Sequence, residues 1–233
     1  MISFKQRSGQ KELLDNPAIP FEDIKRNMQE LNAINTLLGG HKITQKGFGI
    51  LTKNISQDIE ISVVEIGCGG GDNLRAIQTF ANKKKLKIKL TGVDINPECI
   101  AYAKQQSANK DITFICSDYK TVSFPQPPHI IFSSLFCHHF TDDELIEMLQ
   151  WQYQNSTVGF FINDLHRHPL AYYSIKKLTG LFSKSYLVKN DAPISVRRSF
   201  IKSDWKKLLQ GAHINNYTIR WQWAFRWLII ITQ

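Results

Sequence analysis

Short apolar runs alternate with helical segments through the middle of this chain, and that alternation constrains the fold more tightly than any other feature. The runs that predict strands span residues 61–66, 88–93, 112–115, 130–133 and 158–162. Between them, the sequence predicts helices over residues 72–80, 97–106 and 142–153. Strands that alternate with helices form a parallel sheet with helices packed on its faces. We therefore expect an α/β fold.

The flanking regions predict further helices and a closing hairpin. Apolar residues recur at helical spacing over residues 21–38, and Gly39-Gly40 ends that helix. Helices are also expected at 170–182 and 203–209, followed by strands at 216–221 and 225–231. The short link between the last two strands implies an antiparallel hairpin. With 233 residues, the chain is expected to form one domain, residues 1–233.

A glycine-rich loop follows the first predicted strand. The segment VVEIGCGGGDN, residues 63–73, places Gly67, Gly69 and Gly71 between that strand and the next helix. Glycine tolerates positive φ and lacks a Cβ, so a ligand can lie against such a turn. Loops of this kind bind nicotinamide dinucleotides or S-adenosylmethionine. The dinucleotide fingerprint needs a further glycine where this chain has Asp72, which disfavours a dinucleotide.

Glu65 lies two residues before the first glycine and completes the pattern ExGxGxG. An acid at this place attracts a ligand with an amino group and a sulfonium, and repels a pyrophosphate. The pattern resembles motif I of class I S-adenosylmethionine-dependent methyltransferases, here a small-molecule, type 11/12-like domain. The resemblance covers about residues 61–164. It implies a Rossmann-like, seven-stranded, mostly parallel sheet with helices on both faces and an antiparallel C-terminal hairpin.

The resemblance also assigns roles to residues at successive strand ends. Asp94 would accept both ribose hydroxyls of the cofactor, Asp118 and Tyr119 would contact the adenine, and Ser133 would face the methionine end. The residues expected to bind S-adenosylmethionine are Glu65, Gly67, Cys68, Gly69, Gly71, Asp94, Ile95, Asp118, Tyr119 and Ser133. The product would be S-adenosylhomocysteine. In this interpretation residues 1–55 are a helical extension or lid, 56–164 the cofactor-binding core, and 165–233 the substrate-side insertion and last strands.

Two histidine-rich segments follow the fourth and fifth strands. The first, SSLFCHHF, contains His138 and His139, and the second, NDLHRHP, contains His166, Arg167 and His168. An imidazole is suited to removing a phenolic proton near neutral pH. We predict His166 as the catalytic base, with His139 as the second candidate. The residues expected to contact the acceptor are His138, Arg167, His168 and Tyr172.

The expected reaction is O-methylation of a small phenolic or polyketide-like hydroxyl. C-methylation of a quinone precursor is the nearest enzymatic alternative. An RNA-binding or RNA-modifying protein is an alternative of another class, because the formal net charge is +9. Where base-amino methyltransferases carry DPPY or NPPY, this chain reads SSLF, so nucleic acid is an unlikely partner.

The cysteines and the N-terminal residues bear on metal binding, disulfides and location. The four cysteines lie far apart without a CxxC pair, so neither a metal site nor disulfides are expected. No signal-peptide pattern and no apolar stretch long enough to span a membrane are present, so a cytoplasmic location is expected. The partner would be a small molecule, and the protein a monomer or homodimer.

Overall fold

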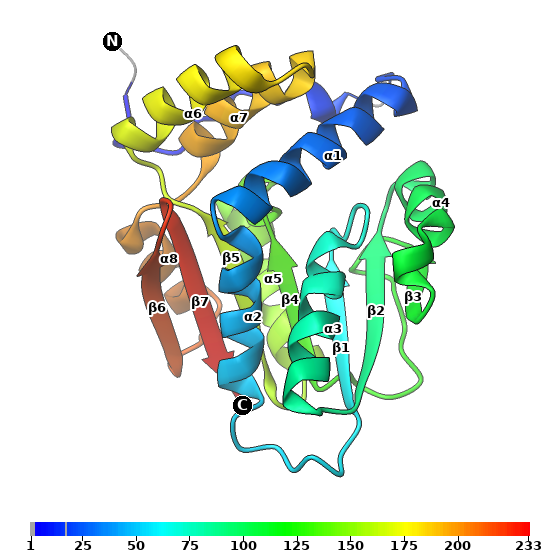
Figure 1. Ribbon diagram of the computed structural model, residues 1–233. Helices are drawn as coiled ribbons and strands as arrows, with labels where there is room; N and C mark the ends of the chain where they lie inside the picture. Colours follow the sequence, from blue (N-terminus) through cyan, green and yellow to red (C-terminus); the bar gives the residue numbers. More distant parts are fainter. Residues whose placement is uncertain (1–2, 17) are drawn as a thin grey trace.

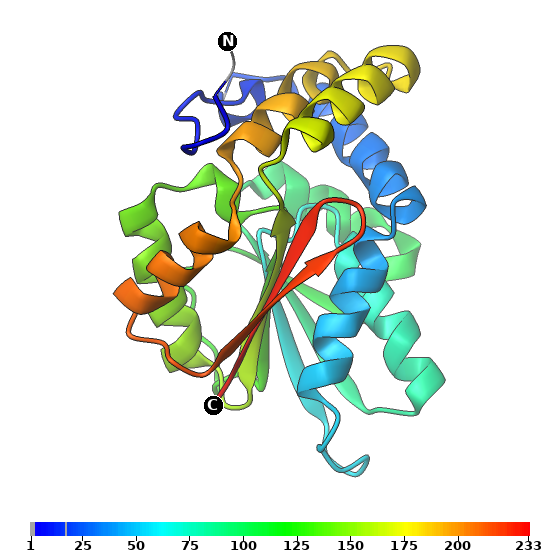
Figure 2. The same ribbon diagram turned by 90° about the vertical axis from the view of Figure 1, so that its left-hand side faces the viewer.

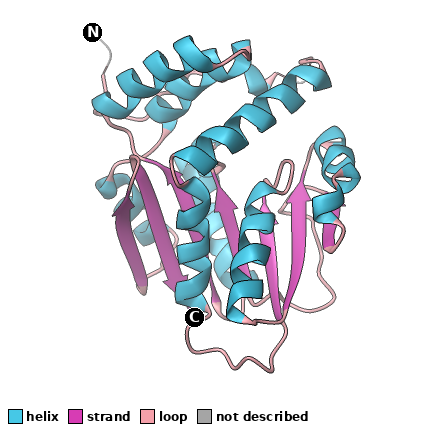
Figure 3. Ribbon diagram, in the orientation of Figure 1, coloured by secondary structure: helices cyan, strands magenta, loops and turns pink. Residues whose placement is uncertain are grey.

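The predicted strands assemble into a seven-stranded sheet with the order β3-β2-β1-β4-β5-β7-β6. The structure is a computed structural model that describes residues 3–16 and 18–233. The strands are β1 (Ile61–Ile66), β2 (Ile88–Asp94), β3 (Ile112–Cys116), β4 (Ile130–Ser134), β5 (Gly159–Leu165), β6 (Tyr217–Gln222) and β7 (Arg226–Thr232). Strands β1 to β5 pair in parallel, and β7 runs antiparallel between β5 and β6. The expected mostly parallel sheet with a C-terminal hairpin is confirmed (Figures 1 and 3).

Helices cover both faces of the sheet, as expected. One face packs against α2 (Gly40–Leu51), α3 (Asp72–Lys84) and α4 (Pro97–Gln105). The other face packs against α5 (Asp142–Asn155) and α8 (Lys202–Gly211). Figure 2 looks along the sheet and shows the two helical layers on either side of it. Short 3-10 turns lie at Leu13–Asp15 (η1), Ser107–Asn109 (η2) and Cys137–His139 (η3).

Three helices lie above the edge of the sheet where the parallel strands end. They are α1 (Phe21–Leu37), α6 (Pro169–Phe182) and α7 (Tyr186–Arg198), drawn at the top of Figures 1 and 2. Helix α7 contacts both α1 and α6, and η1 of the N-terminal segment also lies against α7. Ligands of open α/β sheets bind at this edge. The three helices therefore define the space in which a substrate can lie.

Two helices were not predicted from the sequence. No element was predicted between Gly39-Gly40 and the first strand, but Gly39 adopts φ +79° and separates α1 directly from α2. The helix α7 was missed because Pro193 interrupts its pattern, yet the proline is accommodated inside the helix. Among the described residues, no helix is both long and apolar enough to cross a membrane.

Candidate active site

The glycine loop between β1 and α3 has the conformation that its sequence requires. Gly67, Gly69 and Gly71 have φ values of +70°, +48° and +78°, a region that side chains disfavour. A Cβ at Gly67 would also collide with the ring of Phe136, which packs on the loop. The backbone of the loop is thus closely covered by the turn after β4. A larger residue cannot replace Gly67 without moving that turn, whereas at Gly71 a Cβ would collide with Phe114 of β3.

Two acids on neighbouring strands, Glu65 of β1 and Asp94 at the end of β2, form hydrogen bonds with the loop and with the start of α3. The Asp94 carboxylate accepts hydrogen bonds from the amides of Gly69 and Asn96, both at 2.9 Å. Glu65 is fully buried, and its Oε1 accepts a hydrogen bond from Asn73 at 3.0 Å while Oε2 has no partner. Burial raises the pKa of Glu65 well above its usual value. An orphaned buried oxygen beside a glycine loop is a group that a positively charged ligand can satisfy.

A cavity of about 300 Å³ opens beside the loop, and we call it the loop cavity. Its lining residues are Ile66, Gly67, Val93, Asp94, Ile95, Ser117, Asp118, Tyr119, Lys120, Phe136, Phe140 and Glu144. The structure therefore brings together Gly67, Asp94, Ile95, Asp118 and Tyr119, as the sequence predicted. Carboxylates at one wall and aromatic rings at another suit a nucleoside, whose ribose is polar and whose base is flat.

The remaining predicted cofactor residues lie around the loop cavity and do not line it. Ser133 is fully buried at the end of β4, and its Oγ lies 3.5 Å from the sulfur of Cys137. The buried side chain of Cys68 approaches the position that a Cβ on Gly92 would occupy. Both side chains therefore pack among the strand ends next to the loop. The predicted contact of Ser133 with the methionine end of the cofactor stays a prediction.

A second cavity of about 360 Å³ lies beneath the three upper helices, and we call it the helical cavity. Its walls are mainly apolar side chains of α1, α6 and α7, including Leu31, Ile34, Ile175, Leu178 and Val188. Trp223 and Phe225, in the link between β6 and β7, also line it. The few polar groups in such a setting fix the orientation of a ligand.

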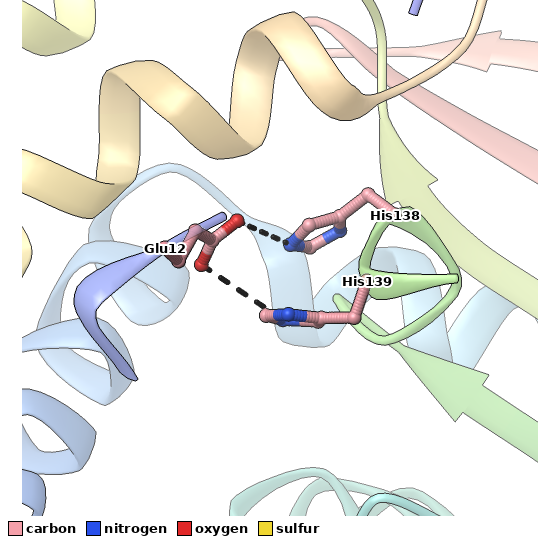
Figure 4. Close-up of side chains that lie close together, drawn as sticks. All are labelled: Glu12, His138 and His139. Carbon is pink, nitrogen blue, oxygen red and sulfur yellow. Dashed lines mark ion pairs between the residues drawn. The ribbon is translucent and has the colours of Figure 1, made fainter. Parts of the chain in front are cut away.

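His138 and His139 both reach the helical cavity, where they meet an acid from the N-terminal segment. Oε1 of Glu12 lies 3.7 Å from Nε2 of His138, and its Oε2 lies 3.9 Å from Nε2 of His139 (Figure 4). Glu12 also accepts a hydrogen bond from the Ser195 hydroxyl at 2.8 Å. Burial raises the pKa of Glu12 to about 6, although the nearby His139 opposes the shift.

The other ring nitrogen of each histidine, Nδ1, lies within hydrogen-bond distance of a second acid. Nδ1 of His138 lies 2.8 Å from Oδ1 of Asp164, and Nδ1 of His139 lies 3.0 Å from Oδ1 of Asp15. Asp164 is fully buried. Although burial opposes its ionisation, the charge and the hydrogen bond of His138 hold the pKa of Asp164 below its usual range. An ionised Asp164 can only accept, so Nδ1 of His138 carries a proton toward it.

The three facing groups could also be considered as metal ligands. Glu12, His138 and His139 each offer one ligand atom, and these atoms lie within 4.8 Å of one another. Arg198, however, donates to the backbone carbonyls of both histidines, at 3.0 and 2.6 Å. It also pairs with Asp15 at 2.7 Å, so the cluster belongs to a network of hydrogen-bonded acids, histidines and one arginine. We therefore interpret the cluster as a group that accepts and shares protons.

The structure places the preferred predicted base, His166, outside the helical cavity. Its Nδ1 accepts a hydrogen bond from the indole of Trp221 at 3.3 Å, and its ring packs on Trp227. Burial lowers the pKa of His166 to about 4, with the positive charges of His168 and Arg167 contributing. The chain turns at the end of β5, so this side chain points to the outer strands of the sheet.

The other residues of this segment that were predicted to contact the acceptor also lie outside the lining of the helical cavity. The guanidinium of Arg167 is buried and donates to Asp204 and to backbone carbonyls, among them Phe4. His168 accepts from the amide of Leu170 and thereby caps α6, and Tyr172 packs edge-on against Phe4. All three stabilise the junction between β5, α6 and the N-terminal segment. Of the residues predicted as catalytic or as acceptor contacts, His138 and His139 line the helical cavity.

Glu12 and Arg226 are among the helical-cavity residues that sequence reasoning missed. Glu12 lies in a segment without periodicity, so nothing local indicates that it folds back to η3. Arg226 gave a usable signal, because it is a charged residue at the start of the otherwise apolar run RWLIII. Charged side chains are rarely buried without a specific reason.

Comparisons with known proteins agree with this geometry. Residues 63–155 match the family model described as a methyltransferase domain. No curated protein matches the chain in sequence. The plantazolicin methyltransferase BpumL, solved with S-adenosylhomocysteine, is 19% identical, with a TM-score of 0.66 over 90% of each chain. Human N-acetylserotonin methyltransferase, solved with S-adenosylmethionine, is 18% identical, with a TM-score of 0.65 over 97% of this chain and 63% of that one.

A third similar structure is a methyltransferase named for a different substrate. The magnesium protoporphyrin IX methyltransferase of Synechocystis is 15% identical, with a TM-score of 0.52 over 97% of this chain and 89% of that one. The sheet order, the glycine loop and these likenesses define a Rossmann-like methyltransferase fold. The match over residues 63–155 assigns a methyltransferase domain to that part of the chain, and the solved structures show that the chain has the fold of class I, S-adenosylmethionine-dependent methyltransferases.

Proposed function

We propose that this enzyme methylates a hydroxyl group of a small, largely apolar metabolite held in the helical cavity. The observation that carries the proposal is a pair of cavities that both include residues of the turn after β4: a loop cavity suited to a nucleoside, and an apolar cavity with a buried His138–Asp164 pair. O-methylation of a phenolic hydroxyl fits these two sites better than C-methylation does, because the cavity contains a base for a hydroxyl proton.

The residues of the loop cavity would hold the methyl donor. Asp94 keeps lone pairs free for the ribose hydroxyls beyond its two hydrogen bonds to backbone amides. Tyr119 and Asp118 would hold the adenine, and the unpartnered oxygen of Glu65 would attract the positively charged end of the donor. Bound S-adenosylmethionine supplies an electrophilic methyl group on a sulfonium, which is already a good leaving group.

His138 would act as the general base toward the acceptor. Its Nε2 accepts the hydroxyl proton as the acceptor oxygen forms its bond to the methyl carbon and the bond from that carbon to sulfur breaks. Asp164 holds Nδ1–H throughout and stabilises the imidazolium that results. The products are the methylated acceptor and S-adenosylhomocysteine, and the proton leaves from His138. The apolar helices above exclude water, which strengthens the electrostatic interaction between His138 and Asp164.

The direct test is methyl transfer from labelled S-adenosylmethionine to a small-molecule extract of the host, with each product identified by mass and by the position of the new methyl group. We expect a product that carries the label on oxygen. A label on carbon would replace this proposal with C-methylation. A label found only in RNA, together with tight and salt-dependent RNA binding, would replace it with nucleic-acid modification.

A further inference from the structure

Arg226 brings a positive charge into the helical cavity without an anion of its own. It begins β7, is only 4% exposed, and lines the cavity beside Trp223 and Phe225. Its guanidinium donates to two neutral side-chain amide oxygens, of Asn35 at 2.6 Å and of Asn163 at 3.4 Å. Among residues 3–16 and 18–233, no carboxylate lies within ion-pair distance of it.

A buried charge of this kind is costly unless a counter-charge is supplied. Removing an ion from water without pairing it costs several kcal/mol. Burial lowers the pKa of Arg226 to about 10, and attraction to Asp164 acts in the opposite direction, so the side chain stays charged at neutral pH. Asp164, however, is engaged by the His138 imidazole and by the amide of Leu165. Arg226 therefore has no carboxylate of its own in direct contact with it, and its hydrogen-bond partners are neutral amides.

The surroundings of the guanidinium add to the positive potential. Gly40, the first residue of α2, lies so close that a Cβ there would be 3.2 Å from the Arg226 guanidinium. The helix begins at this point without a side-chain cap, because its N-cap residue is Gly39. Helix N-termini present unpaired N–H groups and a partial positive charge. Two positive features side by side are stable together when an anion lies near them.

We propose that Arg226 binds a carboxylate of the methyl acceptor, and that the acceptor is an acid. This inference rests on the proposed function and names the substrate class. A planar guanidinium matches a carboxylate through two parallel hydrogen bonds. The acids of the cavity, Glu12 and Asp191, come from the N-terminal segment and α7, whereas Arg226 comes from β7. This separation of charge orients an acidic acceptor with its carboxylate at Arg226 and its hydroxyl at His138.

The sheet order separates this subsite from the donor. The glycine loop follows β1, and β4 and β5 lie between β1 and β7. At about 4.8 Å per strand, the backbones of β1 and β7 are about 14 Å apart. Arg226 lines the helical cavity and is absent from the lining of the loop cavity. The acceptor therefore supplies the anion in preference to the donor's own carboxylate.

The test compares acids with their neutral amides on enzyme saturated with S-adenosylhomocysteine. The probes are benzoate with benzamide, and 4-hydroxyphenylacetate with 4-hydroxyphenylacetamide, and their affinities are measured by calorimetry or ligand-observed NMR. We expect the native enzyme to bind each acid about tenfold more tightly than its amide. Arg226→Gln should remove that preference, and Arg226→Lys should retain part of it. The matched control is Arg220→Gln on the exposed side of β6, which should keep the full preference.

Several outcomes would overturn the inference. Equal binding of acid and amide by the native enzyme would overturn it. This comparison uses the native protein alone, so it does not depend on the folding of a variant. An acid preference that persists in Arg226→Gln would do so too. A loss of S-adenosylhomocysteine affinity in Arg226→Gln, with the acid preference unchanged, would assign the charge to the donor instead. Failure of the native enzyme to bind S-adenosylhomocysteine at all contradicts the proposed function itself, so the two failures are distinguishable.

Discussion

At the scale of single residues, two histidines on neighbouring strand ends have opposite surroundings. His138 is buried with one ring nitrogen held by Asp164 and the other open to the helical cavity. His166 lies against Trp221 and Trp227, outside that cavity. The two imidazoles are chemically identical, so their roles depend on where the backbone at the end of each strand directs them.

This difference leads to a paired prediction. His138→Ala should lower kcat roughly 100-fold or more, because the acceptor hydroxyl loses its base, while the affinity for S-adenosylhomocysteine changes less than about threefold. His166→Ala serves as the matched control and should leave kcat within about threefold of the native value. Steady-state kinetics and calorimetric titration measure both quantities. A large loss of kcat in His166→Ala, with His138→Ala active, would return the base to His166.

At the scale of elements, the docking of α2 on the sheet depends on a small residue. Gly47 of α2 faces β5 so closely that a Cβ would lie 2.6 Å from the ring of Phe161. That ring is stacked on Phe132 of β4 with centroids 4.9 Å apart, so it has little room to move. The absence of a side chain at Gly47 therefore sets how near the helix approaches the strands.

We expect Gly47→Ala to lower the free energy of unfolding by about 1–3 kcal/mol, because the added methyl overpacks the interface. The control is Gly180→Ala in α6, where a Cβ would meet no atom within 4 Å. That variant should gain about 0.5–1 kcal/mol from the better helix propensity of alanine. Urea unfolding followed by circular dichroism measures both changes. Equal stabilisation by the two substitutions would show that α2 shifts freely on β5.

The same elements show which parts of the fold could be predicted from the sequence. Strands β1 to β5 and the glycine loop are encoded locally, by continuous apolar runs and by glycines at fixed offsets. Helix α2 was missed because its first residues, Gly39-Gly40-His41, are typical of a loop. The positions of Glu12 and Arg226 depend on contacts with residues far away in the sequence, and no local pattern encodes those contacts.

At the scale of the whole molecule, the N-terminal segment ties the upper helices to the sheet edge. Arg7 donates to Asp142 at the start of α5 and to the carbonyl of Phe140. Farther along, the amides of Leu13 and Leu14 donate to the two carboxylate oxygens of Asp191 in α7, at 2.8 and 3.0 Å. These contacts hold Glu12 over the two histidines of η3.

Asp191→Ala should release this segment and lower turnover by roughly tenfold, because Glu12 and the wall of the helical cavity are no longer held in place. Hydrogen exchange measured by mass spectrometry should accelerate in residues 3–16, and binding of S-adenosylhomocysteine should stay nearly unchanged. Asp58→Ala, in the exposed turn before β1, is the control and should alter neither quantity. Unchanged exchange in Asp191→Ala would show that other contacts suffice to hold the segment.

The two cavities come from different stretches of the chain. The loop cavity is built within residues 66–144, whereas most of the helical cavity comes from residues 12–38 and 165–226. Divergence in the outer stretches can therefore change the lining of the helical cavity while the loop cavity, the donor site proposed above, stays as it is. A chimera that receives both outer stretches from a homologue should acquire that homologue's choice of acceptor.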